Sequence, residues 1–260
     1  MPEGDTVWRA ARLLDRALAG RELTASDFRV PQLATVDLAG ATVLGTSSRG
    51  KHLLTRIDAE RPWTLHTHLK MEGAWQAYAV GQKWRRPVSE ARVVLTAGDH
   101  VAVGFTLGIV ELLPRQAEAS AVGHLGPDLL GDDWDEDEAL RRLREDPSRP
   151  IHEALLDQTC LAGIGNMYAA ELCFTSGVSP TTPVGEVADL PRLLRRAKMM
   201  LEHNRQRAEQ STTGELRRGR RTWVYRQERC LRCDTAVQVQ MLGPAGRERA
   251  AYSCPSCQPG

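Results

Sequence analysis

Two residues at the start of the chain, Pro2 and Glu3, could do covalent chemistry. An initiator methionine that precedes a small residue is normally removed, so we expect the mature chain to begin at Pro2. An α-amino group has a pKa of about 8, so roughly a tenth of such amines are uncharged at pH 7 and can attack an electrophilic carbon. Glu3 could move the protons that this attack requires. The alternative is that Pro2 is merely a small residue tolerated after the initiator.

Four cysteines near the end of the chain have the spacing of a metal site. Cys230 and Cys233 form one C-x-x-C pair, and Cys254 and Cys257 form a second pair twenty residues further on. This spacing indicates one structural Zn²⁺, because four protein ligands leave no position for water. A disulfide framework is the alternative, although it is unusual in a reducing cell. The other two cysteines stand alone among apolar residues and are predicted to be buried thiols.

A glycine-rich turn and an uneven charge distribution indicate a polyanion as partner. The turn at 163–166 (Gly-Ile-Gly-Asn) would place backbone N–H groups at the start of the following helix, which suits a phosphate. Residues 192–229 hold twelve Lys or Arg against four Glu, although the whole chain has a net charge of only +1. The alternatives are an ordinary helix–helix connection and a solvated helical surface.

The elements that must position these residues fall into two kinds. Asp5 or Thr6 is predicted to cap a first helix that ends before Gly20. Short β-branched or alternating runs then predict a two-layer β-sandwich or barrel. These runs are 23–30, 42–47, 52–57, 64–69, 91–96, 100–105 and 109–113.

The second half of the chain changes to helical periodicity. Residues 114–131 have the composition of a linker, and helices are predicted over the ranges that follow. These ranges are 135–145, 151–158, 167–175 and 187–207. The fold class is therefore α+β, and 260 residues suit two modest domains. No long apolar run and no secretion signal are present, so we expect a cytoplasmic, nucleoid-associated protein without a membrane span.

Four motifs in series resemble one known family. They are Pro2-Glu3-Gly4, Arg49-Gly50-Lys51, Gly163-Ile164-Gly165-Asn166 with Glu171 after it, and the terminal cysteine hairpin. Together they resemble the formamidopyrimidine-DNA glycosylase / endonuclease VIII family, and most closely its endonuclease VIII branch. The resemblance covers essentially the whole chain. It implies an N-terminal helix plus β-sandwich, then a helical domain with a helix–two-turn–helix, then a four-cysteine zinc-finger β-hairpin. The boundaries we predict are 2–115, a linker at 116–131, 132–222 and 223–260.

The resemblance also implies roles for individual residues. Pro2 would be the nucleophile, Glu3 the acid/base, and Lys51 a catalytic lysine that contacts phosphate near the lesion. Met71 would fill the hole left by the flipped nucleotide, or else be a core methionine. The remaining DNA-binding residues would be Asn166, Glu171 and Arg249, and the ligands of one structural Zn²⁺ would be Cys230, Cys233, Cys254 and Cys257.

The function implied is that of a bifunctional DNA glycosylase and AP lyase of base-excision repair. It would remove oxidised pyrimidines through a proline Schiff base, cleave the strand by β,δ-elimination, and act as a monomer on damaged double-stranded DNA, with single-stranded or bubble DNA as further substrates. The alternatives are an oxidised-purine glycosylase and a non-catalytic zinc-containing DNA-binding protein. Thr6, Lys70 and Glu72 depart from the family pattern, which bears on substrate range and strand contacts.

Overall fold

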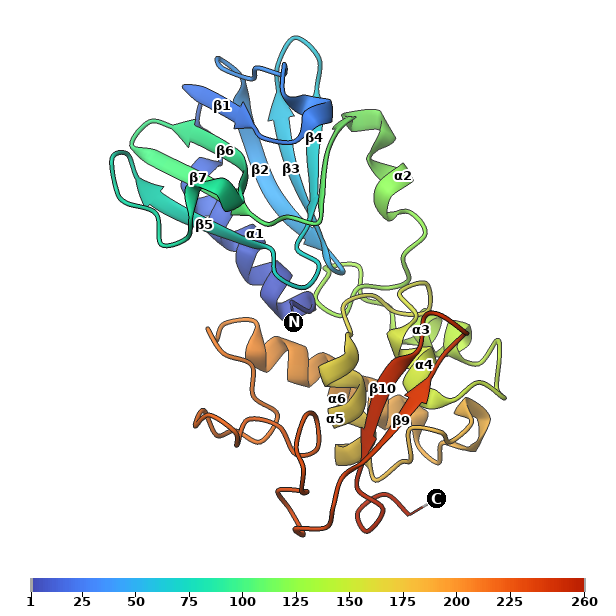
Figure 1. Cartoon of the computed structure of the whole chain (residues 1–260). Helices are drawn as coiled ribbons and strands as arrows, with labels where there is room; N and C mark the ends of the chain where they lie inside the picture. The colour runs from blue at the N-terminus through green and yellow to red at the C-terminus, as the bar shows by residue number, and fades with distance from the viewer. Residues whose placement is uncertain (1, 260) are drawn as a thin grey trace. The chain divides into compact units, whose positions relative to one another are not determined.

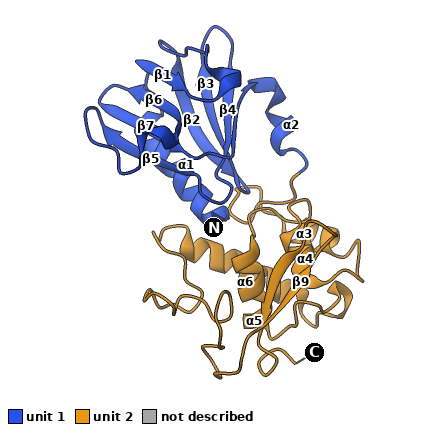
Figure 2. Ribbon diagram, viewed as in Figure 1, with its two compact units in different colours: residues 1–124 blue, residues 125–260 orange. Residues whose placement is uncertain are grey.

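The computed structural model describes residues 2–259, and the chain divides into two compact units at residues 1–124 and 125–260 (Figure 2). The division falls inside the range 116–131 that we predict as a linker. Our finer boundaries at 115, 132 and 223 stay predictions.

The first helix of unit 1, α1 (Gly4–Leu18), begins earlier than we predicted. Its N-cap is Glu3, whose backbone is extended at φ −119° and ψ −175°, so the prediction that Asp5 or Thr6 caps the helix is wrong. Asp5 lies inside the first turn, where the positive end of the helix dipole favours an acidic side chain. Gly20 follows the end of the helix at φ +72°, as predicted for a C′ glycine.

Two antiparallel four-stranded sheets make up the body of unit 1 (Figure 1). One has the order β1-β6-β7-β5 and the other the order β2-β3-β4-β8. The strands are β1 (Ala25–Phe28), β2 (Thr42–Arg49), β3 (His52–Asp58), β4 (Trp63–His68), β5 (Ala74–Ala79), β6 (Ala91–Ala97), β7 (His100–Phe105) and β8 (Ile109–Pro114). Sequence analysis missed β5, because its two buried side chains, Trp75 and Tyr78, are three residues apart and break the two-residue period.

The core of unit 1 is continuous from α1 into the strands. Val7, Leu14 and Leu18 of the helix are buried in one apolar cluster with strand residues such as Leu53 and Leu95. α1 contacts strands of both sheets, β2 and β3 on one side and β5 and β7 on the other. Burial of this apolar face fixes the helix, and therefore the residues just before it, against the sandwich.

Short helical segments complete unit 1. They are η1 (Pro31–Leu33), η2 (Val88–Glu90), η3 (Arg115–Ala117) and α2 (Glu118–Val122). The last two lie in the predicted linker but belong to unit 1, because Glu118 accepts hydrogen bonds from Arg56 (Nε, 3.0 Å) and Thr64 (Oγ1, 2.9 Å) on the sheet. Burial opposes ionisation of Glu118, and these bonds hold its pKa below the ordinary value.

Unit 2 is helical and ends in a β-hairpin. Its elements are α3 (Glu136–Leu143), α4 (Ile151–Leu156), α5 (Asn166–Ser176), η4 (Val184–Glu186), α6 (Leu190–Asn204), β9 (Gln238–Leu242) and β10 (Arg249–Ser253). Asp135 and Asp189 cap α3 and α6 by accepting from the backbone N–H groups of Glu138 and Arg192, each at 2.9 Å. α5 is buried on all sides and contacts α4, α6 and β10, so it is the centre of the unit.

Between α6 and β9, residues 205–228 form neither helix nor strand. No helix within residues 2–259 is both long enough and apolar enough to cross a lipid bilayer.

Candidate functional site

The start of α1 holds Pro2 and Glu3. Glu3 is completely buried, and Pro2 is half-buried. A buried carboxylate is costly unless it is hydrogen-bonded or used in chemistry, and here it directly follows the secondary amine that forms when Met1 is removed. The structure therefore places the two residues predicted to act as nucleophile and acid/base at the start of a helix that the core fixes.

Lys51 lies in a two-residue hairpin turn, as the motif predicted. Arg49 of β2 pairs with His52 of β3, which leaves only Gly50 and Lys51 to reverse the chain. Gly50 has φ +55°, a conformation that suits glycine in tight hairpins. The Lys51 side chain is half-buried.

Met71 lies at the tip of the loop between β4 and β5. Its side chain is 59% exposed, which rules out the alternative that it is a core methionine. The loop is tight: the Gly73 N–H donates to the Leu69 carbonyl at 2.9 Å, and a Cβ on Gly73 would lie 2.4 Å from that oxygen. Lys70 adopts φ +51°, so the loop carries backbone strain beside Met71.

The Lys51 turn and the Met71 loop lie at the same end of unit 1. His52 at the start of β3 is the register partner of His68 at the end of β4. The turn before β3 and the loop after β4 therefore lie at the same end of the sheet. Figure 1 draws the N-terminal end of α1 at this end of the unit as well. Four residues predicted to act together are thus gathered at one end of the sandwich.

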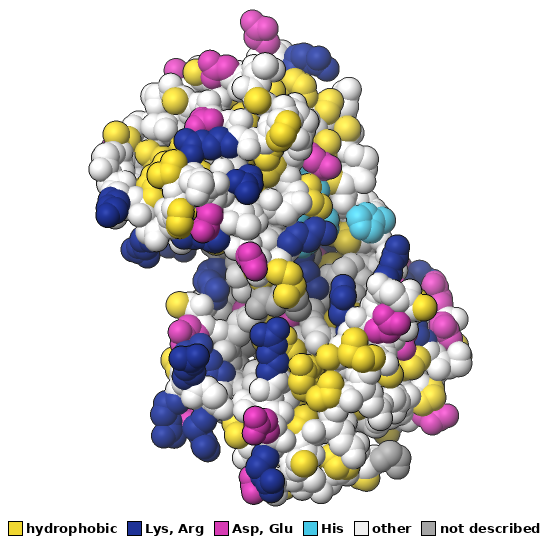
Figure 3. Space-filling view, viewed as in Figure 1, with side chains coloured by type: hydrophobic (Ala, Val, Ile, Leu, Met, Phe, Trp, Pro, Cys, Tyr) yellow, Lys and Arg dark blue, Asp and Glu magenta, His cyan; other side chains and the backbone are white. Residues whose placement is uncertain are grey.

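Histidines that the motif analysis did not single out lie at this same end. His66 Nδ1 is 2.9 Å from Glu111 Oε2, and His66 Nε2 is 2.8 Å from His52 Nδ1. The ring of His52 also meets those of His68 and His124 edge to face, with centroids 5.0 and 6.3 Å apart. Histidine side chains reach the surface next to one another in Figure 3. The signal in the sequence was the spacing His-x-His at 66–68, which puts both rings on one face of a strand.

Burial keeps two of these imidazoles neutral. Burial and then the neighbouring His68 lower the pKa of His52 to about 3. Burial and then the charge of Lys70 lower the pKa of His68 to about 4. At pH 7 the rings of His52 and His68 therefore carry no charge.

In unit 2, the glycine-rich turn and the cysteine hairpin meet at Asn166. This residue begins α5, and its Nδ2 donates to the backbone carbonyl of Ala250 at 2.9 Å. Arg249, the residue before, begins β10 and is exposed. Two of the predicted DNA-binding residues are thus adjacent. The buried ring of His152 lies beside Asn166, and burial lowers the pKa of His152 to about 4.

Glu171 takes a place that we did not predict. It is completely buried, and burial raises its pKa. Its Oε1 accepts from the N–H groups of Val224 and Tyr225, each at 2.9 Å, and its Oε2 accepts from the Trp223 N–H at 2.7 Å and from the Thr212 hydroxyl. In this conformation the carboxylate faces its own chain. The structure shows that Glu171 holds a loop of its own chain, and its contact with DNA stays a prediction.

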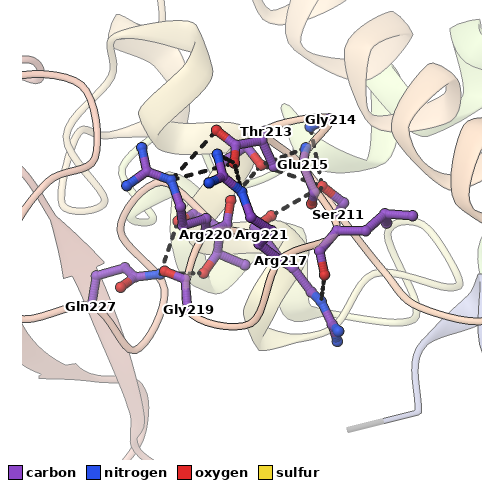
Figure 4. Close-up of polar contacts among 11 residues, drawn as sticks. Ser211, Thr213, Gly214, Glu215, Arg217, Gly219, Arg220, Arg221 and Gln227 are labelled. Carbon is purple, nitrogen blue, oxygen red and sulfur yellow. Dashed lines mark hydrogen bonds and ion pairs between the residues drawn. The ribbon is translucent and has the colours of Figure 1, made fainter.

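That loop, residues 205–222, is basic and folds on itself (Figure 4). Glu215 pairs with Arg217 (2.8 Å) and Arg220 (3.3 Å), and the Thr213 hydroxyl donates to the Arg220 carbonyl at 2.6 Å. At its start, the Ser211 N–H donates to the Asn204 side-chain oxygen at 2.8 Å. Figure 3 shows Lys and Arg side chains crowded on the part of unit 2 that carries α6 and this loop. This face suits a polyanion.

The four predicted cysteine ligands come together. Their sulfur atoms all lie within 4.8 Å of one another, with the Cys233–Cys254 sulfurs 3.4 Å and the Cys230–Cys257 sulfurs 4.0 Å apart. A tetrahedral ion with metal–sulfur bonds near 2.3 Å requires sulfurs about 3.8 Å apart. A disulfide requires about 2.05 Å, so the thiols are unpaired and form a cluster that could hold a metal ion.

Comparisons with known proteins agree with this arrangement in both halves. The family model of the formamidopyrimidine-DNA glycosylase N-terminal domain matches residues 1–106, and that of the formamidopyrimidine-DNA glycosylase H2TH domain matches residues 125–213. A probable endonuclease 8 2 of Streptomyces coelicolor is 56% identical over 268 residues, covering 100% of this chain and 95% of its own length. A DNA-(apurinic or apyrimidinic site) lyase Nei2 of Mycolicibacterium smegmatis is 48% identical, covering 99% of each chain.

A solved structure shares the fold. The formamidopyrimidine-DNA glycosylase of Lactococcus lactis, crystallised with DNA containing an AP site, superposes with a TM-score of 0.79 over 99% of this chain and 100% of its own. The two are 22% identical, so this likeness speaks for the fold alone. With the two matched domains and the relatives above, the chain belongs to the formamidopyrimidine-DNA glycosylase / endonuclease VIII family.

Proposed function

We propose that this protein is a bifunctional DNA glycosylase and AP lyase of base-excision repair, with the amine of Pro2 as its nucleophile. The observation that carries the proposal is the buried carboxylate of Glu3 directly after Pro2, at the end of a helix fixed by the core. The family and its relatives support the same activity.

The reaction would proceed in steps that these groups can serve. The Pro2 nitrogen bonds to C1′ as the bond from C1′ to the base breaks and the base leaves with a proton. The Pro2 nitrogen then loses its own proton as Glu3 gives one to the sugar ring oxygen and the ring opens to an iminium. The iminium makes the C2′ proton acidic, so its removal expels the 3′ phosphate. Loss of the C4′ proton then expels the 5′ phosphate, and water releases the sugar fragment from Pro2.

The other predicted residues would hold the strand. Lys51 would contact a phosphate near the lesion and support strand cleavage, Arg249 would contact phosphates, and Asn166 would lie beside the finger that presents Arg249. Met71 would fill the space of the flipped nucleotide, for which its exposure and flexible side chain suit it. Glu171 would act indirectly, by holding the loop at 205–222.

Zinc is the metal we propose for the cysteine cluster, since thiolate ligands in tetrahedral spacing favour it. Cys230, Cys233, Cys254 and Cys257 would hold it, and its contribution would be structural. Lowered zinc content in Cys254→Ser would support this, whereas unchanged zinc content would contradict it.

The experiment that tests the activity is borohydride trapping on a duplex with one abasic site. Reduction should fix a covalent protein–DNA adduct for the wild type, and Pro2→Gly should trap far less. No adduct from the wild type, or an undiminished one from Pro2→Gly, would contradict the proposal and leave the non-catalytic zinc-containing DNA-binding protein. Mass spectrometry of the same sample should show a chain that begins at Pro2.

Oxidised pyrimidines are the lesions we propose. Relatives at 56% and 48% identity carry endonuclease 8 names, and the stretch from Glu209 to Trp223 leaves little room for a long loop that closes over a flipped purine. A side-by-side incision assay should cut a thymine glycol duplex faster than an 8-oxoguanine duplex, and the reverse order would favour the oxidised-purine alternative. Gel filtration should show a monomer, and the same assay with bubble and single-stranded substrates would show which form of DNA is preferred.

A further inference from the structure

A hydrogen-bonded chain crosses three strands on one face of unit 1. His66 of β4 is the register partner of Glu111 on β8, and the same ring reaches His52 on β3. The two hydrogen bonds measure 2.9 and 2.8 Å, and the rings of His52 and His66 are stacked with centroids 5.1 Å apart. His66 is only 3% exposed, whereas the Glu111 side chain is 52% exposed.

Hydrogen-bond chemistry assigns a direction to this chain. An ionised carboxylate can only accept, so the Nδ1 of His66 must carry a proton. In a neutral His66 the Nε2 is then an acceptor, and the Nδ1 of His52 must donate to it. His52 is thereby fixed as the Nδ1–H tautomer with its Nε2 unprotonated.

A second histidine at this end is fixed in the opposite tautomer. The backbone N–H of Lys70 donates to the Nδ1 of His68 at 2.9 Å, so the proton of neutral His68 must lie on Nε2. The groups whose charges bear on His52 are His66, His68, His124 and Lys70, and each of them opposes a charge on its ring. The series of hydrogen bonds that starts at Glu111 therefore ends on the neutral ring of His52, which has basic neighbours.

Because of the position of His52, the hydrogen bonds from Glu111 through His66 to His52 also support the turn that holds Lys51. β2 is the edge strand of its sheet, and the Gly50–Lys51 turn joins it to β3, its neighbour in the sheet. His52 is the first residue of β3, directly after Lys51. The bond from its ring to His66 ties the base of the turn to β4 and, through Glu111, to β8.

We propose that Glu111, His66 and His52 are positioning residues for Lys51, which they hold in place by fixing the ring of His52 across the sheet. The inference rests on the proposed function, in which Lys51 serves strand cleavage. Its physical basis is general: a catalytic side chain is held to the required geometry by hydrogen bonds of the residues behind it.

One test needs no activity. Long-range proton–nitrogen NMR of the imidazoles at pH 7.5 should show His52 as Nδ1–H, His66 as Nδ1–H and His68 as Nε2–H. In His66→Phe the His52 ring should lose its single tautomer. A His52 found as Nε2–H beside a doubly protonated His66, or a His52 spectrum unchanged in His66→Phe, would overturn the proposed chain.

The second test measures single-turnover strand cleavage on an abasic-site duplex. His66→Phe removes both hydrogen bonds with little change of shape, and the cleavage rate should fall about 5- to 10-fold, as expected for one lost positioning hydrogen bond. The dissociation constant for the duplex should stay within about twofold, since no proposed DNA contact is removed. His66→Gln keeps an acceptor near the Nε2 position and should restore part of the rate.

Two further variants keep the test decisive. Glu111→Ala changes an exposed residue outside the apolar core, so it should slow cleavage by a smaller factor of about 2–3 even if His66→Phe does not fold. His100→Phe, on the other sheet, is the matched control and should leave the rate unchanged. If the wild type traps and cleaves but both chain variants match it, the inference fails while the proposed function stands. If the wild type neither traps nor cleaves, the proposed function fails instead.

Discussion

The two units hold their functional residues by different means. In unit 1 the residues proposed for catalysis lie at the end of a sandwich whose apolar core is continuous from α1 into both sheets. In unit 2 the end of the chain has a small apolar cluster around Phe174 and Val224, which includes two of the cysteines. There the geometry depends on the cysteine cluster, on Glu171 and on Asn166. The residues proposed for covalent chemistry are thus held by a packed apolar core, and those proposed for strand binding are held by polar contacts and by the cysteine cluster.

Glu3→Gln should have the largest effect, and it should lower the reaction rates set by unit 1 without changing DNA binding by unit 2. We expect glycosylase and lyase rates to fall by about 10²- to 10⁴-fold, because a general acid/base is lost, with little change in DNA affinity. Single-turnover kinetics and a binding titration measure both. Glu22→Gln, an exposed acid in the same unit, is the control. A rate within a few-fold of wild type would exclude Glu3 from the chemistry.

The converse experiment should unfold the hairpin of unit 2 and leave unit 1 folded. Cys254→Ser, or removal of metal by a chelator, should unfold the hairpin and abolish tight DNA binding, because the cluster replaces a core there. Thermal unfolding should show that the unit 1 transition is retained. Ser256→Ala, an exposed neighbour in the same turn, should behave as wild type. Unchanged binding without metal would contradict this division of labour.

Glu171→Gln tests the polar anchor alone. The amide would present a donor where the carboxylate now accepts four hydrogen bonds, so unit 2 should lose about 2–3 kcal/mol of stability. Hydrogen exchange should speed up at the amides of residues 223–225. If these amides exchange as slowly as in the wild type, the anchoring role is wrong.

Lower pH should weaken unit 2 through His152. Burial lowers the pKa of His152 from its ordinary value of 6.5 to about 4 in the folded protein, so the unfolded chain binds more protons between these values. The stabilising contribution is present above pH 6.5 and is lost as the pH falls toward 4. From pH 7 to pH 5 the loss should be about 2 kcal/mol. Denaturation of His152→Leu should show a flatter pH dependence than the wild type or the exposed control His203→Gln.

Arg249→Ala should have the smallest effect. Loss of one phosphate contact should weaken binding by about 1 kcal/mol and reduce the salt dependence of binding by about one unit of slope. The lyase rate at saturating DNA should change little, because Arg249 is proposed to bind the strand and takes no part in the reaction itself. An unchanged salt slope would remove Arg249 from the interface.

Sequence reasoning succeeded where local chemistry dictates geometry. The cysteine spacing, the Gly50 turn and the helical periodicity of α3 to α6 are each visible in a few neighbouring residues. It failed where tertiary contacts decide. β5 shows no two-residue period, and the N-cap of the first helix is Glu3 rather than Asp5 or Thr6. The contacts that Glu171 makes about 50 positions further along the chain were not predicted. The chain from Glu111 to His52 depends on strand register, which no local pattern encodes.

Glu171 holds Thr212 on one side and residues 223–225 on the other. The ends of the intervening segment are therefore pinned independently of what lies between them. Because loop closure depends only weakly on length, this segment can gain, lose or exchange residues at little cost to the helices or the hairpin. It is the part of the molecule where new specificity could arise without rebuilding the scaffold.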